Sequence, residues 1–195
     1  MALPRHDLRL SRSGLLRLGA AGGAALVVPT GIARAASTPS DGDLAYLRLL
    51  VGAELLAADF SRRALHRRQG DLFRRARADA QTHYAVLAQL LQDAGQPPAK
   101  PGDFGFTYPH RSFSSQASVL RLGRRVARLV LGAYLGAIGA VEDSHFRLRL
   151  GQMAANTAQH LAALDRASGR PTVGPALPSA LSMNAVSNAL DGFES

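Results

Sequence analysis

Residues 95–114 read GQPPAKPGDFGFTYPHRSFS and decide how the chain can fold. This stretch contains four prolines and shows no helical repeat of apolar residues. A loop of about 20 residues is unusual inside a compact domain, so it must join points that lie far apart. Fully extended, about 20 residues reach up to about 66 Å, whereas a helix of about 25 residues is about 38 Å long. The loop can therefore run the length of a helical bundle and return the chain to the same end.

Two apolar-periodic segments lie on each side of this loop. They span about residues 43–68 and 71–94 before it, and about residues 115–141 and 144–168 after it. In each segment the inward positions recur at alternating spacings of three and four residues, which is typical of amphipathic helices. No segment alternates with the period of two that a half-buried strand requires.

The connections inside each pair of segments are very short. The first pair is joined around Gln69-Gly70 and the second around Glu142-Asp143, where Asp143 or Ser144 can cap the following helix. Such short links force consecutive helices to lie antiparallel. We therefore predict an all-α four-helix bundle over residues 43–168, with one long crossover between its second and third helices.

The two ends of the chain have a different composition from the bundle. Residues 1–35 are basic, then apolar and rich in glycine and alanine, and end in Ala33-Arg34-Ala35, which is the layout of an export signal. Within it, SRSGLL at 11–16 is similar to the twin-arginine motif with Ser13 in place of the second arginine, so the export route stays open. Residues 36–42 form a polar linker. The tail, residues 169–195, is rich in proline and glycine, with a short helix predicted over about 184–193, capped by Ser182.

Composition excludes several classes of function. The chain has 195 residues, with 23 Lys and Arg against 14 Asp and Glu, and a formal charge of +9. It contains no cysteine, which excludes disulfides, zinc–thiolate sites, iron–sulfur clusters and thiol catalysis. The low aromatic content, 6%, disfavours a stacking surface for single-stranded nucleic acid. We expect no nucleic acid partner.

Three polar residues lie on the inward faces of the predicted helices: Glu54, His83 and His160. A buried carboxylate without a partner costs several kcal/mol, so Glu54 needs a hydrogen-bond donor or a metal ion. The known ferritin-like di-iron site uses one Glu from each of two helices and a Glu-x-x-His pair from each of the other two. Here each histidine is present, but the residue three positions before it is Ala80 or Thr157.

The chain beyond its export signal resembles the exported bacterial ferritin-like proteins that carry a twin-arginine-type signal. The segments that carry this resemblance are LLVGAE (49–54), ARAD (76–79) through His83-Tyr84, DFGF (103–106), LGAYLGA (131–137) and AQHL (158–161). The resemblance implies that Glu54, His83 and His160 match family ligands. It also implies that the bridging carboxylates would fall at Ala80 and Thr157, and the third-helix Glu near Ala127 or Arg128, so all three are missing.

Without bridging carboxylates, two cations would repel each other across the site, so we expect no working di-iron centre. One hypothesis is that Glu54 hydrogen-bonds His83, His160 or Tyr134 in a polar remnant of the site. The other is that Glu54, His83 and His160 bind one iron or manganese ion, because two histidines and a carboxylate are the ligands of mononuclear iron enzymes.

The predicted function is a binding or structural role, without catalysis, for a protein exported to the periplasm, the cell envelope or the medium. The alternative is a metal-binding protein with an oxidoreductase or storage role. Arginines also gather where the first two helices meet, on a solvated surface or as a site for anionic membrane lipids. They are Arg62, Arg63, Arg67, Arg68, Arg74, Arg75 and Arg77. A homodimer and a protein partner stay open.

Overall fold

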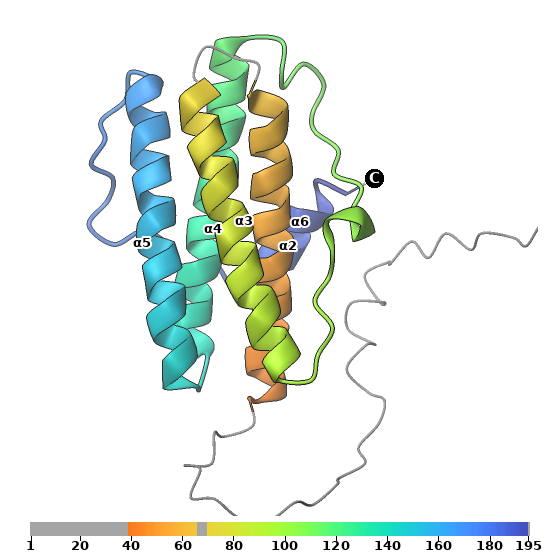
Figure 1. Ribbon diagram of the computed structural model, residues 1–195. Helices are drawn as coiled ribbons and strands as arrows, with labels where there is room; N and C mark the ends of the chain where they lie inside the picture. The colour runs from red at the N-terminus through yellow and green to blue at the C-terminus, as the bar shows by residue number, and fades with distance from the viewer. Residues whose placement is uncertain (1–38, 66–69, 195) are drawn as a thin grey trace, which may run out of the picture.

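The computed structural model describes residues 39–65 and 70–194, which form helices and loops (Figure 1). Over these residues the only strand-like pairing is a single bridge between Phe106 and Glu194. None of the helices in this part of the chain is long and apolar enough to cross a bilayer. The predicted export signal, residues 1–35, lies outside the described residues. The helices are α2 (Asp41–Ala64), α3 (Gly70–Asp93), η1 (Pro101–Asp103), α4 (Gln116–Ala140), α5 (Ser144–Ala167) and α6 (Met183–Asp191).

The four long helices form the predicted bundle. In Figure 1, α2 and α3 run antiparallel, residues 94–115 then pass along the outside of the bundle, and α4 and α5 complete it as a second antiparallel pair. The prediction of an all-α four-helix bundle with one long crossover is therefore confirmed. The first helix ends at Ala64 rather than near Arg68, and the amide of Leu65 donates to the oxygen of Arg62 in a tightened last turn.

Polar side chains at the N-caps set where the helices begin. Ser40 accepts a hydrogen bond from the amide of Asp43, and Ser115 accepts one from the amide of Ser118. Asp143 caps α5, and Ser182 caps α6 close to the short helix that the sequence predicts. Each cap satisfies a backbone amide that has no partner inside its helix, and each contributes about 1 kcal/mol.

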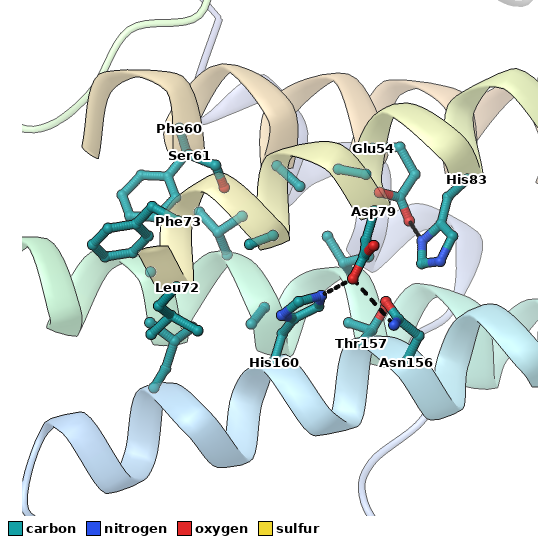
Figure 2. A pocket seen from close by; sticks show the side chains of 18 residues that line it. Glu54, Phe60, Ser61, Leu72, Phe73, Asp79, His83, Asn156, Thr157 and His160 are labelled. Carbon is teal, nitrogen blue, oxygen red and sulfur yellow. Dashed lines mark hydrogen bonds and ion pairs between the residues drawn. The ribbon is translucent and has the colours of Figure 1, made fainter. Parts of the chain in front are cut away.

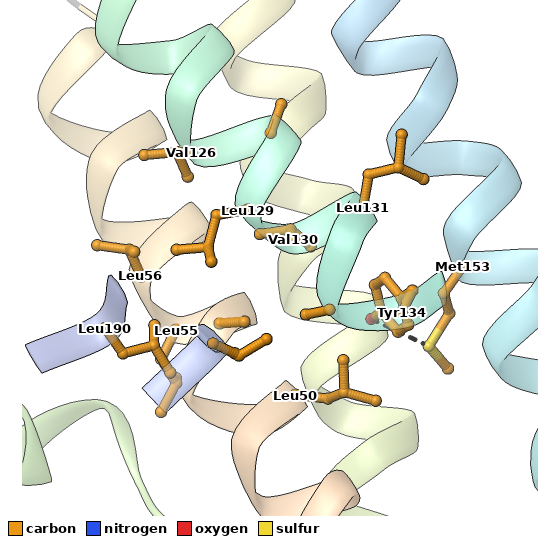
Figure 3. Close-up of a cluster of buried hydrophobic side chains, with 14 of the residues drawn as sticks. Leu50, Leu55, Leu56, Val126, Leu129, Val130, Leu131, Tyr134, Met153 and Leu190 are labelled. Carbon is orange, nitrogen blue, oxygen red and sulfur yellow. Dashed lines mark hydrogen bonds between the residues drawn. The ribbon is translucent and has the colours of Figure 1, made fainter. Parts of the chain in front are cut away.

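Apolar side chains from α2, α4 and α6 form a continuous core (Figure 3). Leu50 and Leu56 of α2 are fully buried, as is Val119 of α4. Leu190 of α6 lies against the same cluster, so the short C-terminal helix closes the face of the bundle between α2 and α4. Burial of each such side chain stabilises the fold by about 1.5–3 kcal/mol.

Two buried polar contacts hold the ends of the bundle. The carboxylate of Asp43, 2% exposed, accepts the amides of Glu142 at 2.8 Å and Asp143 at 3.2 Å, which ties the start of α2 to the turn between α4 and α5. Nearer the other end, Arg124 of α4 and Asp165 of α5 form a buried ion pair. Both contacts restrict how α4 and α5 can slide along their neighbours.

Candidate functional site

A buried carboxylate lies at the centre of the bundle. Glu54 of α2 is 2% exposed, and its Oε1 accepts the hydroxyl of Tyr134 of α4 at 2.5 Å. Nδ1 of His83, on α3, lies 3.0 Å from the same oxygen. Burial and then the negative charge of Glu54 raise the pKa of Tyr134 well above its ordinary value, so this hydroxyl stays protonated and donates a hydrogen bond to Glu54.

A second carboxylate forms a separate cluster between α3 and α5. Oδ2 of Asp79 lies 2.7 Å from Nε2 of His160, and it accepts a hydrogen bond from the side-chain amide of Asn156 at 3.2 Å (Figure 2). The side chain of Asp79 is 32% exposed, so this cluster reaches the surface, whereas Glu54 does not. Helices α3 and α5 otherwise touch little, so Asp79 supplies a main link between them.

A small cavity lies between the two clusters. It offers about 50 Å³ to the centres of water molecules, which is room for a few waters. Oδ1 of Asn156 is buried and has no hydrogen-bond partner among the residues described. A bound water would satisfy this acceptor. The polar residues on the wall are Glu54, Ser61, Asp79, His83, Asn156, Thr157 and His160, and the other lining residues are apolar or glycine.

The three residues singled out from the sequence all face this cavity, but they do not meet at one point. Glu54 and His83 are in contact, whereas His160 contacts Asp79 instead of Glu54. Within 39–65 and 70–194, no three His, Asp or Glu side chains are placed so that they could hold one metal ion.

Sequence reasoning missed Asp79 and Asn156 as parts of the site. Asp79 lies four residues before His83, and Asn156 lies four residues before His160. Residues four apart share one face of a helix, so this spacing was the signal that could have found both. The known di-iron motif has its Glu three residues before each histidine, so that motif does not point to either residue.

Comparison with known proteins identifies the family of this bundle. A ferritin-like domain profile matches residues 42–170, which is most of the chain. The chain belongs to the ferritin-like domain family. Its fold is similar to the crystal structure of a hypothetical protein from Methanococcus jannaschii DSM 2661, with a TM-score of 0.60 and 14% identity over 87% of this chain and 100% of that one. At that identity the likeness concerns the fold alone. No curated protein matches the chain in sequence.

The cavity is lined by positions at which the sequence analysis expected the carboxylates of a di-iron motif to be missing. Ala80, Ala127 and Thr157 all line it. Arg128, the other position considered for the third-helix Glu, is exposed. The hydroxyl of Thr157 donates to the oxygen of Met153 at 2.9 Å, so it turns back to its own helix. Short side chains therefore line the cavity at these three positions.

The donor set does not fit a pair of iron ions. Glu54 and Asp79 are the only acidic residues among the described side chains that line the cavity. Two carboxylates cannot neutralise two divalent cations, and Oε1 of Glu54 and Oδ2 of Asp79 already accept hydrogen bonds from other side chains.

Proposed function

We propose that this ferritin-like protein is an exported bundle with a binding or structural role and no catalytic metal centre. One observation carries the proposal: the side chains at the ligand positions are paired with other protein groups. Glu54 is held by Tyr134 and His83, and His160 is held by Asp79. Tyr134 and His83 supply the partners that the buried carboxylate of Glu54 requires, which is the role that metal ions have in a di-iron site.

Export to the periplasm, the cell envelope or the medium is part of this proposal. It is supported by the basic and then apolar composition of residues 1–35 and by the small residues at Ala33 and Ala35. We expect cleavage before Ala36. Mass measurement of the N-terminal peptide of the secreted protein checks this, and an N-terminus that still carries the apolar run would contradict it.

One observation favours a second candidate function, which is binding of a single iron or manganese ion. Asp79 brings a second carboxylate to the cavity, so its wall carries two carboxylates and two imidazoles, a set that suits such ions. Binding would first require Glu54 to lose the hydroxyl of Tyr134, and His160 to leave Asp79. The two candidate functions thus make opposite predictions about metal content.

Metal analysis separates them. The full chain is purified without chelator and titrated with Mn²⁺, and with Fe²⁺ in the absence of oxygen. We expect less than stoichiometric metal and no saturable binding, because each candidate ligand already has a partner. Glu54→Gln is the diagnostic variant, and Glu142→Gln, which removes an exposed carboxylate, is its matched control. Stoichiometric metal that disappears in Glu54→Gln and persists in Glu142→Gln would overturn the proposal in favour of the second candidate.

A further inference from the structure

A groove on the outside of the bundle offers far more room than the interior cavity. It lies between α2, α3 and residues 101–106 of the crossover and encloses about 600 Å³. This volume falls within the range of about 300–1,000 Å³ that is typical of small-molecule sites. The cavity at the polar centre offers about 50 Å³. An organic ligand would therefore fit in the groove but not in the interior cavity.

One wall of the groove is apolar. The rings of Phe104 and Phe106 stack with their centroids 5.4 Å apart and their planes 4° apart. Phe106 is 8% and Leu55 5% exposed, whereas Phe104 is partly buried and Pro101 is exposed. An aliphatic or aromatic group would therefore lie mainly on Phe104 and Pro101, which both line the groove.

Basic side chains also line the groove. Arg62, Arg63 and Arg77 line the groove, and Asp59 is the only acidic residue among the described side chains that line it. Three guanidinium groups and one carboxylate leave a net charge of +2. Such an excess attracts an anion.

Two of the three arginines are already engaged. Oδ1 of Asp59 accepts a hydrogen bond from Nη2 of Arg62 at 2.5 Å, and its Oδ2 accepts one from Nε of Arg63 at 2.8 Å. Arg63 also donates to the oxygen of Phe106 at 3.1 Å and lies over the ring of Tyr108. Arg63 thus holds the crossover against α2, which makes it part of the frame of the groove.

Arg77 is different. It lies on α3 and is partly buried, yet it makes no hydrogen bond or ion pair with any residue in the described part of the chain. Arg74, on the same helix, is paired with Asp71. A guanidinium group presents a planar fork of donors that matches a carboxylate or a phosphate. Arg77 therefore offers such a fork at the edge of a ligand-sized groove.

We propose that this groove binds an anionic amphiphile, with its carboxylate or phosphate group at Arg77 and its apolar part on Phe104 and Pro101. Gln81, one turn along α3 from Arg77, lines the groove and can donate a further hydrogen bond to the head group. A free fatty-acid-like molecule and an anionic membrane lipid share this chemistry. The inference does not depend on whether the polar centre binds metal, because none of its residues belongs to that centre.

Calorimetric titration of the full chain with octanoate, and in parallel with octanol and with acetate, tests the groove. We expect octanoate to bind, and octanol and acetate each to bind at least tenfold more weakly. Octanol lacks the carboxylate, and acetate lacks the apolar chain. Arg77→Gln should weaken octanoate binding about tenfold or more, because it removes the donor fork. Arg75→Gln removes the same charge from an exposed position on α3 that does not line the groove, and should change binding less than twofold.

Vesicles of phosphatidylcholine with and without phosphatidylglycerol distinguish the two sources of ligand. If octanoate fails to bind but the anionic vesicles bind, and Arg77→Gln weakens this binding tenfold more than Arg75→Gln, the proposal holds with a lipid as the ligand. Equal losses in the two variants, equal binding of octanol and octanoate, or no binding of either probe would overturn it. Arg77→Lys keeps the positive charge but lacks the planar set of guanidinium donors, so it can replace Arg77→Gln if that variant does not fold. The comparison of octanoate, octanol and acetate uses the wild-type chain and needs no variant.

Discussion

At the scale of single residues, Glu54 is a charge buried at the centre of a helical bundle. A carboxylate that is 2% exposed would cost several kcal/mol without partners. Tyr134 and His83 reach the same oxygen of Glu54 from two different helices. Their hydrogen bonds offset the cost of burial and also specify how α2, α3 and α4 face one another.

The first prediction concerns the hydroxyl of Tyr134. Tyr134→Phe should lower the free energy of unfolding by about 2 kcal/mol, because a hydrogen bond to a buried charged group is lost while the ring still fills its space. Urea denaturation near neutral pH measures the change. Tyr46→Phe is the matched control, since Tyr46 is partly buried and makes no hydrogen bond within the described residues, and it should change stability by less than about 0.5 kcal/mol.

The same pair of variants also gives a pH test. The folded protein raises the pKa of Tyr134 above its ordinary value of 10.0. The resulting stabilisation is fully present below pH 10 and is lost as the pH rises further, because the unfolded chain then releases a proton that the folded chain retains. The stability difference between wild type and Tyr134→Phe should therefore shrink above pH 10. A constant difference would contradict the hydrogen bond to Glu54.

At the scale of elements, α4 carries glycines where the C-terminal tail crosses it. The amide of Leu181 donates to the oxygen of Gly132 at 2.9 Å. A side chain at Gly132 would meet Leu181 Cγ at 2.7 Å, and one at Gly136 would overlap the backbone oxygen of Leu181. The tail can lie directly on the backbone of α4 because both positions lack a Cβ.

A comparison of two glycines tests this contact. Gly136→Ala should destabilise the protein by about 1–3 kcal/mol, because the tail must move away from α4. Gly139→Ala lies on the same helix with open space around it, and should stabilise slightly, by up to about 1 kcal/mol, because alanine favours the helix. Thermal unfolding of both variants measures these changes. Similar behaviour of the two would show that the tail does not pack on Gly136.

The helices were the most predictable elements, because their apolar repeats and N-caps are local in sequence. Asp143 was one of two cap residues expected for α5, and its side chain accepts the amide of His145. The sequence predicts the C-terminal end of the first helix near Arg68, which is too far along the chain. The apolar repeat of that helix continues to Leu65, but the helix itself ends at Ala64. Periodicity locates a helix well and its last turn poorly.

At the scale of the whole molecule, the crossover is held to the bundle through Asp59. This carboxylate of α2 accepts the hydroxyl of Tyr108, in the crossover, at 2.9 Å, and it pairs with Arg62 and Arg63. Phe60 and Phe113 both pack on the ring of Tyr108 and also on each other. The long loop that sets the topology is thus fixed by an ion-pair network and an aromatic cluster.

This network predicts how stability depends on acid. Burial alone would raise the pKa of Asp59, but hydrogen bonds from Arg62 and Tyr108 and the charges of Arg63 and Arg62 lower it below its ordinary value of 3.8. Because the folded pKa is lowered, the stabilisation is present above pH 3.8 and is lost as the pH falls through the folded value. Wild type should lose stability below about pH 4 more steeply than Asp59→Asn.

Urea denaturation between neutral pH and acid measures this difference. Asp71→Asn is the control, because the side chain of Asp71 is 95% exposed and its pairing with Arg74 is confined to one helix turn. It should follow the wild-type curve. An Asp59→Asn variant that does the same would show that Asp59 does not hold the crossover.

The sequence by itself determined the all-α class, the four helices, the crossover and the inward positions of Glu54, His83 and His160. These features depend on local periodicity and on the length of one loop, which can be evaluated without knowing how the helices pack. Only the tertiary structure decided that Glu54 pairs with Tyr134, that His160 pairs with Asp79, and that Arg77 lines a groove beside the crossover. Such pairings join residues far apart in the chain, and a rotation of one helix by a fraction of a turn would exchange their partners.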